Sequence, residues 1–399
     1  MDPSPNVAQM RPSATLAVSA LAKKLASEGR DIINLGAGEP DFDTPKHIAE
    51  AAIQGIRDGR TRYTPAPGLP ELRKAIAGVL SRQAGRELPW EGVVVTSGTK
   101  QALFNACFSL FGPGDEVLIG TPYWTSYPEM VGLARATPVL VTGAEERDLK
   151  VTPDDLEAAA NDRTRGFLFS SPGNPTGVVY ERHELQAIAE WARDRGVWLL
   201  SDEIYRQIYF GEGGEAPGVL DLTPESLGPW VLFDGTSKAC AMTGWRLGFS
   251  FCDPEYARTF ASLQSHTTSN AATPSQIAAL AAYSRWDETL AAVAEMRVAF
   301  RRRRDLVTRL FRERLPDLPF LEPHGAFYLF ARVDGIFGPG RANAQELCSW
   351  ILEEAGVALV PGEAFGDPRY ARLSYATSDD QLEAAVDRMA GLLTGVASG

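Results

Sequence analysis

A lysine among small residues follows one of the short apolar runs of this 399-residue chain. Lys238 ends the sequence Asp-Gly-Thr-Ser-Lys, which comes directly after the run 231–233. An amine at the end of a buried strand loses hydration, which lowers its pKa and makes it a candidate nucleophile that forms an imine with a carbonyl group. For this motif by itself, a solvated loop lysine is the alternative.

A carboxylate and a phosphate-binding turn follow two other apolar runs. Asp202 comes after 197–200, and ligands of open α/β sheets bind at such carboxyl ends of strands. Ser97-Gly98-Thr99-Lys100 follows 93–95 and opens a helical pattern, where free N–H groups suit a phosphate. Each motif has an alternative: Asp202 as a turn or cap residue, and the second motif as an ordinary helix cap.

Motifs for several other chemistries do not occur. The chain contains no Gly-x-x-x-x-Gly-Lys-Ser/Thr loop, and Gly36–Asp41 lacks the third glycine of a dinucleotide fingerprint. Its four histidines are scattered, which predicts no metal site. The net charge of −12 argues against a nucleic-acid partner.

The one basic run, Arg301–Arg304, lies inside the amphipathic stretch 288–315. Apolar residues recur there at helical spacing. We therefore expect the four arginines on a solvated helix face and assign them no function.

The cysteines and the N-terminal residues bear on the compartment. The cysteines form no Cys-x-x-Cys pair, which predicts buried, reduced thiols and a cytoplasmic protein. Residues 1–10 lack the apolar core of a signal peptide, and no run of about 18 apolar residues follows, so we expect neither export nor a membrane span. The four cysteines are Cys107, Cys240, Cys252 and Cys348.

The elements that must position these motifs alternate along the chain. Between residues 93 and 252, short β-branched or aromatic runs alternate with helical patterns, as in parallel strands joined by crossover helices. We predict an α/β fold with a mostly parallel seven-stranded sheet covered by helices. The predicted strands are 93–95, 116–119, 138–141, 166–169, 197–200, 231–233 and 248–251, and the helices include 100–110, 184–195 and 254–263.

The pattern changes near residue 290, where a long charged helical stretch begins. The N-terminal segment ends in a Gly- and Pro-rich crossing loop at 36–45, so we expect it to pack against the C-terminal part. We therefore predict a large domain over 43–289 and a smaller α+β domain from 1–42 and 290–399. The expected elements of the smaller domain are a helix at 17–28, strands at 327–331 and 357–360, and a helix from Asp379.

In order and spacing, the motifs together resemble those of the class I, fold type I aminotransferases that use pyridoxal 5′-phosphate (PLP), especially bacterial aspartate aminotransferases. The resemblance covers nearly the whole chain. The intervals from Asn174 to Asp202 and from Lys238 to Arg246 are similar to those of such enzymes. The motifs that carry it are GAGEPDF at 36–42, the segments 63–69, 97–103 and 236–248, PYW at 122–124, SPGNPTG at 171–177, SDEIY at 201–205 and RLSYATS at 372–378.

The resemblance implies that Lys238 holds PLP as an imine and that Asp202 keeps its pyridine nitrogen protonated. Asn174 and Tyr205 would hydrogen-bond the phenolic oxygen, and Trp124 would stack on the ring. The implied catalytic residues are Lys238, Asp202 and Tyr205, and the implied phosphate ligands are Arg246 with the amides of Gly98, Thr99 and Lys100.

Two further implications concern the phosphate. Many relatives carry a serine three residues before the lysine, where this chain has Gly235. That contact stays unassigned, with Thr236 and Ser237 as candidates. Tyr63 resembles the residue that reaches the phosphate of a neighbouring subunit, which implies a homodimer with shared active sites.

The substrate α-carboxylate is implied to pair with the planar fork of Arg372 and with the backbone N–H of Gly38. Trp124 and Asn174 are expected to border the substrate as well. The resemblance thus implies amino acids and 2-oxo acids as substrates.

The pocket for the substrate side chain resembles that of some bacterial aspartate aminotransferases. These enzymes meet the distal carboxylate with an N-terminal Ser/Thr pair and a lysine, and Ser13, Thr15 and Lys100 match that pattern. Helix capping by Ser13 is the alternative for this pair.

The resemblance implies ping-pong transfer of an amino group from aspartate to 2-oxoglutarate, with glutamate and prephenate as further substrates. A broad aromatic or methionine aminotransferase stays open, as do a carbon–sulfur lyase and an aminocyclopropane carboxylate synthase of this fold. The alternative from another class is a regulatory module that binds PLP without turnover. Such regulators carry an appended DNA-binding domain, for which residues 1–42 are too few.

Overall fold

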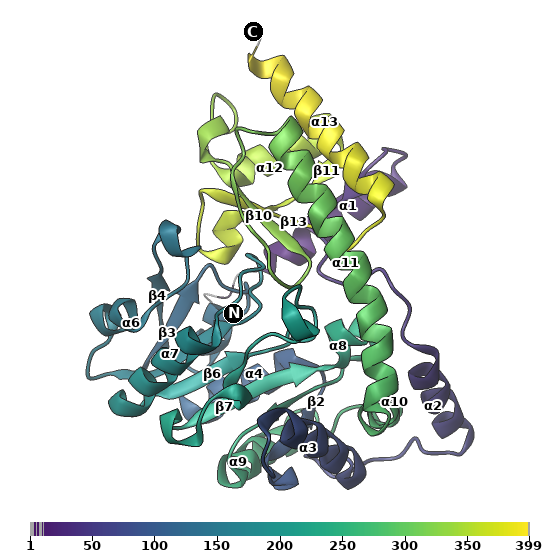
Figure 1. Cartoon of the computed structure of the whole chain (residues 1–399), viewed down its shortest axis with the longest axis vertical. Coiled ribbons are helices and arrows are strands. Elements are labelled where there is room, and N and C mark those ends of the chain that lie inside the picture. Colours follow the sequence, from purple (N-terminus) through teal and green to yellow (C-terminus); the bar gives the residue numbers. More distant parts are fainter. Residues whose placement is uncertain (1–3, 5, 8–9, 11, 398–399) are drawn as a thin grey trace.

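The computed structural model describes residues 4, 6–7, 10 and 12–397, without the side chains of 394–397. Figure 1 shows a large sheet flanked by helices and, beyond it, a smaller sheet covered by the two C-terminal helices, with the long helix α11 running between the two parts. Part of the N-terminal segment 1–10, for which we predicted no signal peptide, lies outside the described residues.

The large sheet has seven strands in the order β2-β8-β7-β6-β5-β3-β4. Strand β8 runs antiparallel to both neighbours, and the other paired strands are parallel. The prediction of a mostly parallel sheet is therefore confirmed. The strands are β2 (Val93–Thr96), β3 (Glu116–Thr121), β4 (Thr137–Thr142), β5 (Thr164–Ser170), β6 (Trp198–Asp202), β7 (Trp230–Gly235) and β8 (Gly248–Phe251).

Successive side chains of these strands point to opposite faces, and both faces are buried. Val94 and Leu168 join one apolar cluster, whereas Val93 and Phe167 join the other. This burial on both faces explains the nearly continuous apolar runs. One face is covered by α4 (Thr99–Leu110), α5 (Tyr127–Leu133) and α9 (Pro254–Ser265), and the other by α3 (Pro70–Ala84), α6 (Pro153–Ala159), α7 (Arg182–Arg195) and α10 (Thr273–Ser284).

The smaller sheet has four strands in the order β12-β13-β10-β9, and its pairs are antiparallel. The predicted strand 357–360 is in fact two short strands, because β11 pairs with β1 whereas β12 joins the smaller sheet. The strands are β9 (Phe320–Leu321), β10 (Tyr328–Arg332), β11 (Val357–Ala358), β12 (Val360–Pro361) and β13 (Tyr370–Ser374), and the helices are α11 (Trp286–Arg314), α12 (Ala344–Ala355) and α13 (Asp379–Ala397).

The N-terminal segment packs against the C-terminal part. Helix α1 (Ala14–Ser27) contacts β11 and β12, and β1 (Ile33–Asn34) pairs with β11 in parallel register. The chain then crosses to the large sheet through residues 36–45 and enters α2 (Lys46–Arg57). The division into two domains near residues 42 and 290 stays a prediction, and α11 spans the second of these positions.

The prediction of a solvated basic face on α11 is wrong for Arg303. This residue is only 8% exposed, and its guanidinium pairs with Asp41 of the crossing loop. Arg304 is half-buried, lies 5.1 Å from the ring of Phe210 and donates to the Pro323 carbonyl. Helical periodicity assigns charged residues to the solvent side, although a charge with a partner elsewhere in the chain can lie inside.

The four cysteines are buried free thiols, as predicted. Within the part of the chain that the structure describes, no helix has the length and apolar character needed to cross a membrane.

Candidate active site

Three chemically active side chains lie at the carboxyl ends of adjacent parallel strands. Asn174 follows β5, Asp202 ends β6, and Lys238 lies in the short helix α8 (Thr236–Ala239) after β7. Because β5, β6 and β7 are neighbours in the sheet, their carboxyl ends bring these residues to one edge. Lys238 and Asp202 therefore lie at the same edge of the sheet.

The Lys238 side chain is half-buried, and its Nζ donates to the Gly38 carbonyl. It lies 5.8 Å from the ring centroids of both Tyr205 and Phe327. Burial, and next the charge of Arg372, lower the pKa of Lys238 to about 8. A substantial fraction of the amine is thus neutral near physiological pH, as a nucleophile or proton carrier requires.

Asp202 is 4% exposed and accepts hydrogen bonds from the Tyr127 hydroxyl at 2.6 Å and from the Ile204 N–H at 3.2 Å. Burial raises the pKa of Asp202 to about 6, and the hydrogen bond from Tyr127 acts in the opposite direction. Sequence reasoning missed Tyr127. It lies three residues after Trp124 in an ordinary apolar helix start, and no pattern signals a partner on another strand.

Arg372 lies in β13 and is 1% exposed. Its Nη1 donates to Asn174 Oδ1 at 2.8 Å and its Nη2 to the Gly36 carbonyl at 2.9 Å. Its Nε is buried without a hydrogen-bond partner, and no ion pair of the described residues includes it. A buried cation without a carboxylate is costly, so this geometry favours an anionic ligand.

A pair of tyrosines links the Lys238 surroundings to Arg372. The hydroxyls of Tyr205 and Tyr328 are 2.7 Å apart, and the Arg372 guanidinium lies 4.4 Å from the Tyr328 ring centroid. A Cβ atom at Gly38 would lie 3.0 Å from the Tyr328 hydroxyl, a tight contact that a side chain here could make only if Tyr328 shifted. Sequence reasoning also missed Tyr328, whose partners are remote in the chain.

The turn after β2 presents the start of α4 toward Arg246. Gly98 precedes the helix with φ of +86°, and a Cβ there would come within 2.4 Å of the Arg246 guanidinium. The Thr99 hydroxyl donates to the Asp234 carbonyl at 3.0 Å, and no side chain caps the helix start. The capping alternative is thus unsupported, and a cation lies beside the helix N-terminus.

The geometry explains why Gly235 cannot be a serine. A Cβ there would lie 2.7 Å from the Gly248 Cα and 2.9 Å from the Thr99 hydroxyl oxygen. The Thr236 hydroxyl contacts the Leu247 carbonyl at 3.4 Å.

Lys100 lies beside Trp124, with its Nζ 4.8 Å from the ring centroid. Partial desolvation lowers the pKa of Lys100, and the charge of Arg246 lowers it further. No ion pair of the described part of the chain includes Lys100. The positive charges of this region act on one another. Arg246 lowers the pKa of Lys100, and Arg372 and Arg246 lower the pKa of Lys238.

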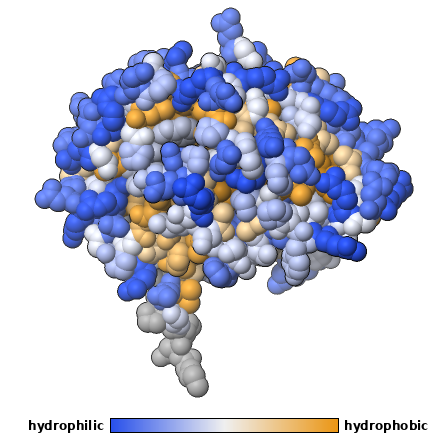
Figure 2. All heavy atoms as spheres, turned by 90° about the horizontal axis from the view of Figure 1, so that it is seen from below, coloured by the Kyte–Doolittle hydropathy of each residue, from blue (hydrophilic) through white to orange (hydrophobic). Residues whose placement is uncertain are grey.

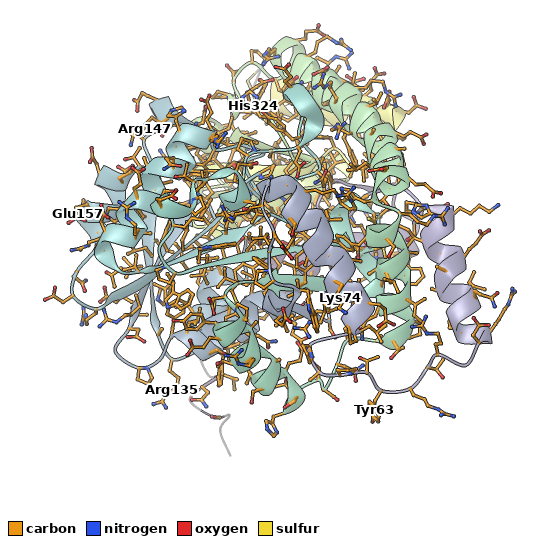
Figure 3. The ribbon with its side chains drawn as sticks, turned by 60° about the horizontal axis from the view of Figure 1, so that its bottom comes forward. Tyr63, Lys74, Arg135, Arg147, Glu157 and His324 are labelled. Carbon is orange, nitrogen blue, oxygen red and sulfur yellow. The ribbon has the colours of Figure 1, made fainter. Side chains whose placement is uncertain are left out.

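Three predicted site residues are not joined to this cluster by a hydrogen bond or ion pair within the described chain. Ser13 and Thr15 are half-buried at the start of α1. Ser13 occupies the cap position, but its side chain accepts no capping hydrogen bond. Tyr63 lies between α2 and α3, is 90% exposed and points outward at the edge of the molecule (Figure 3).

The fold agrees with the comparisons to known proteins. The model of the aminotransferase class I and II family matches residues 30–389, and the chain belongs to this family. The predicted family and fold are thus confirmed. Membership implies PLP as the cofactor.

The chain is similar to bacterial aspartate and aspartate/prephenate aminotransferases over its full length. It is 44% identical to the aspartate aminotransferase of Streptomyces avermitilis, covering 98% of this chain and 96% of the relative. It is 42% identical to the aspartate/prephenate aminotransferase of Cereibacter sphaeroides, covering 98% and 99%. The aspartate aminotransferase of Thermus thermophilus with maleate has a TM-score of 0.91 at 39% identity, covering 98% of this chain and 100% of that structure.

Proposed function

We propose that this protein is an aminotransferase that uses PLP to move the amino group of aspartate to 2-oxoglutarate by a ping-pong mechanism. One observation carries the proposal: the amine of Lys238 and the buried guanidinium of Arg372, which has no acidic partner in the described chain, both donate to the loop 36–45, and the charge of the buried Asp202 acts on Lys238. The names of the relatives support the choice of aspartate.

The residues present fit PLP. Arg246 beside the start of α4 suits a phosphate, which Gly98, Thr99 and Lys100 would bind through backbone N–H groups. The buried Asp202 carboxylate suits a protonated pyridine nitrogen. When bound, PLP supplies an electron sink for the negative charge that develops at the substrate α-carbon.

The remaining aromatic and amide groups orient the cofactor. Trp124 is half-buried and would cover one face of the ring. Asn174 and Tyr205 would donate to the phenolic oxygen. The contact between Arg372 and Asn174 then couples the groups that hold the cofactor to those that hold the substrate.

Lys238 would bind the cofactor covalently and, once released, move a proton at the substrate α-carbon. The lowered pKa, about 8, leaves its Nζ able both to accept and to return that proton near neutral pH. The Gly38 carbonyl accepts from this Nζ and so orients the amine.

Arg372 and the Gly38 N–H would bind the α-carboxylate that all amino-acid substrates share. The planar guanidinium suits a carboxylate, and its deep burial strengthens a charge-assisted hydrogen bond. This contact would also position the α-carbon relative to Lys238.

Lys100, Thr15 and Ser13 would select a second, distal carboxylate. Lys100 is exposed as a residue but holds its Nζ 4.8 Å from the Trp124 ring centroid, and Ser13 is not engaged in a capping hydrogen bond. Glutamate and prephenate carry the same second carboxylate, so they are further substrates of the proposed enzyme.

The proposed enzyme is a cytoplasmic homodimer in which Tyr63 reaches the phosphate of the neighbouring subunit. The 90% exposure of this aromatic side chain supports a contact outside the chain, and Ile53 and Ile56 of the adjacent α2 are exposed as well. The face shown in Figure 2 likewise carries apolar patches among hydrophilic residues. The four buried thiols support a reducing compartment.

Mixing two inactive variants tests the shared site. Hybrids of Tyr63→Ala and Lys238→Ala subunits should contain one intact site and regain part of the activity. Absence of activity in hybrids that still dimerise would contradict sharing.

Steady-state kinetics test the proposed reaction. Aspartate with 2-oxoglutarate should give oxaloacetate and glutamate, with parallel lines in double-reciprocal plots. A donor panel including phenylalanine and methionine provides the comparison, and a higher kcat/KM for either one than for aspartate would contradict the specificity.

A further inference from the structure

The basic run of α11 includes one arginine whose side chain turns inward. The Nη1 and Nη2 atoms of Arg303 donate to the two carboxylate oxygens of Asp41 at 2.7 and 2.8 Å. Two parallel hydrogen bonds between planar groups fix orientation as well as distance. Asp41 is thereby tied to α11 across 262 residues of sequence.

Asp41 lies in the crossing loop 36–45, and the same loop reaches the active site. Its Gly36 carbonyl accepts from Arg372 at 2.9 Å, and its Gly38 carbonyl accepts from Lys238. The loop thus contacts the two cations to which we assign substrate binding and proton transfer.

An aromatic contact reinforces the attachment of the loop to α11. The Phe42 ring packs edge-on against Phe300 of α11 at 5.5 Å, and the Arg303 guanidinium lies 5.4 Å from the Phe42 ring centroid. In the described chain, the ion pair with Arg303 is the only one that Asp41 makes. Loss of Arg303 would leave the Asp41 carboxylate, whose side chain is 32% exposed, without its counter-charge and would release the loop from this contact with α11.

We propose that Arg303 and Asp41 form a positioning pair for the α-carboxylate site, because they hold the crossing loop where Gly38 meets the substrate. The inference rests on the proposed function. Arg303 touches no reacting atom. It acts through Gly36 and Gly38, so its effect falls on the α-carboxylate and is equal for all donors.

Arg303→Met tests the pair, with Arg303→Lys as the conservative variant. The matched control is Arg302→Met, because Arg302 also makes two contacts with one carboxylate, that of Asp379 at 3.0 Å, and contacts no residue of the loop. The measurements on the holoenzyme are KM and kcat for aspartate and alanine, the Kd for maleate by calorimetry, and the Tm.

We expect Arg303→Met to raise both KM values and the maleate Kd about tenfold, the loss of roughly one hydrogen bond to a charged group, with a smaller change in kcat. Arg303→Lys should lie between this variant and the wild type. Arg302→Met should leave the three constants unchanged and lower the Tm less than Arg303→Met, because the Arg302 side chain is exposed. Unchanged constants in Arg303→Met, or equal changes in Arg302→Met, would overturn the proposal.

Asp41→Asn provides the same test if Arg303→Met does not fold. If both single variants fold, the double variant should lose no more than Arg303→Met alone, because the two residues act as one unit. Additive losses would overturn the pairing. If the wild type transaminates alanine but not aspartate, the proposed specificity is wrong, and the KM for alanine still tests the Arg303–Asp41 pair. If the wild type transaminates no donor, the proposed function is wrong, and the Kd for maleate alone tests the pair.

Discussion

The two sides of the proposed active site are built in different ways. On the cofactor side, Asn174, Asp202 and Lys238 follow neighbouring strands whose positions are fixed by a continuous backbone ladder. On the carboxylate side, the loop 36–45 and Arg372 come from opposite ends of the chain and meet through a hydrogen bond from the Arg372 side chain to the Gly36 carbonyl. Changes on the first side should therefore affect the chemical step, whereas changes on the second should affect substrate binding.

Removal of the amine on the cofactor side should have the largest effect. Lys238→Ala should lower kcat by at least about four orders of magnitude, because the variant loses both covalent attachment and the proton carrier. Stopped assays and the visible absorbance of the bound cofactor measure the loss, and circular dichroism checks the fold. Retained activity would place the reacting amine elsewhere.

Asp202→Asn should also reduce kcat, by about two to four orders of magnitude, since an amide does not hold the pyridine nitrogen protonated.

In the cofactor-free protein the same change should increase stability at neutral pH. Folded Asp202 binds its proton more tightly than unfolded Asp202, so the free energy of unfolding falls as pH rises from about 4 to about 6.

The rise in the Asp202 pKa from 3.8 to about 6 corresponds to at most roughly 3 kcal/mol. Urea unfolding of the cofactor-free wild type and Asp202→Asn at pH 4 and pH 7 measures this difference. Equal pH dependence in the two proteins would show that Asp202 is not the buried acid described above.

Lys100→Met should lower kcat/KM for substrates with a distal carboxylate by about ten- to a hundredfold. This loss corresponds to the free energy of one hydrogen bond between charged groups. Alanine and phenylalanine, which lack that carboxylate, should be spared. The backbone N–H at this position remains, so PLP affinity should change little. An equal loss for acidic and neutral donors would assign Lys100 to the cofactor or to the fold.

The smallest expected effect comes from removing the hydrogen bond that Tyr127 donates to Asp202, with Asp202 itself left in place. Tyr127→Phe removes the hydroxyl whose hydrogen bond lowers the Asp202 pKa, so that pKa should rise further. We expect a few-fold lower kcat. In the cofactor-free variant, the free energy of unfolding should continue to fall with rising pH beyond the pH of about 6 at which the fall ends in the wild type. The pH dependence of urea unfolding distinguishes this outcome from a simple packing defect, which would lower stability equally at each pH.

Sequence patterns predicted the cofactor side better than the carboxylate side, for a physical reason. Apolar runs such as 197–200 mark buried strands, and polar residues directly after them must lie at the sheet edge. No local pattern places Arg372 beside Gly36 or Arg303 beside Asp41, because these contacts join residues more than 250 positions apart. Only the family resemblance pointed to Arg372, and Arg303 was assigned to solvent.

Tyr127 and Tyr328 were missed for a related reason. Both have the composition of ordinary core residues, and only the position of their hydroxyls gives them a role. The hydroxyl of a buried tyrosine requires a partner, but the sequence does not identify that partner.

The most direct test of the account is a single half-reaction. Holoenzyme mixed with excess aspartate and no 2-oxo acid should release one oxaloacetate per chain and then stop, with loss of the visible absorbance of the bound cofactor. Addition of 2-oxoglutarate should restore that absorbance and release one glutamate per chain. No oxaloacetate, or continued product formation without a 2-oxo acid, would contradict an aspartate aminotransferase.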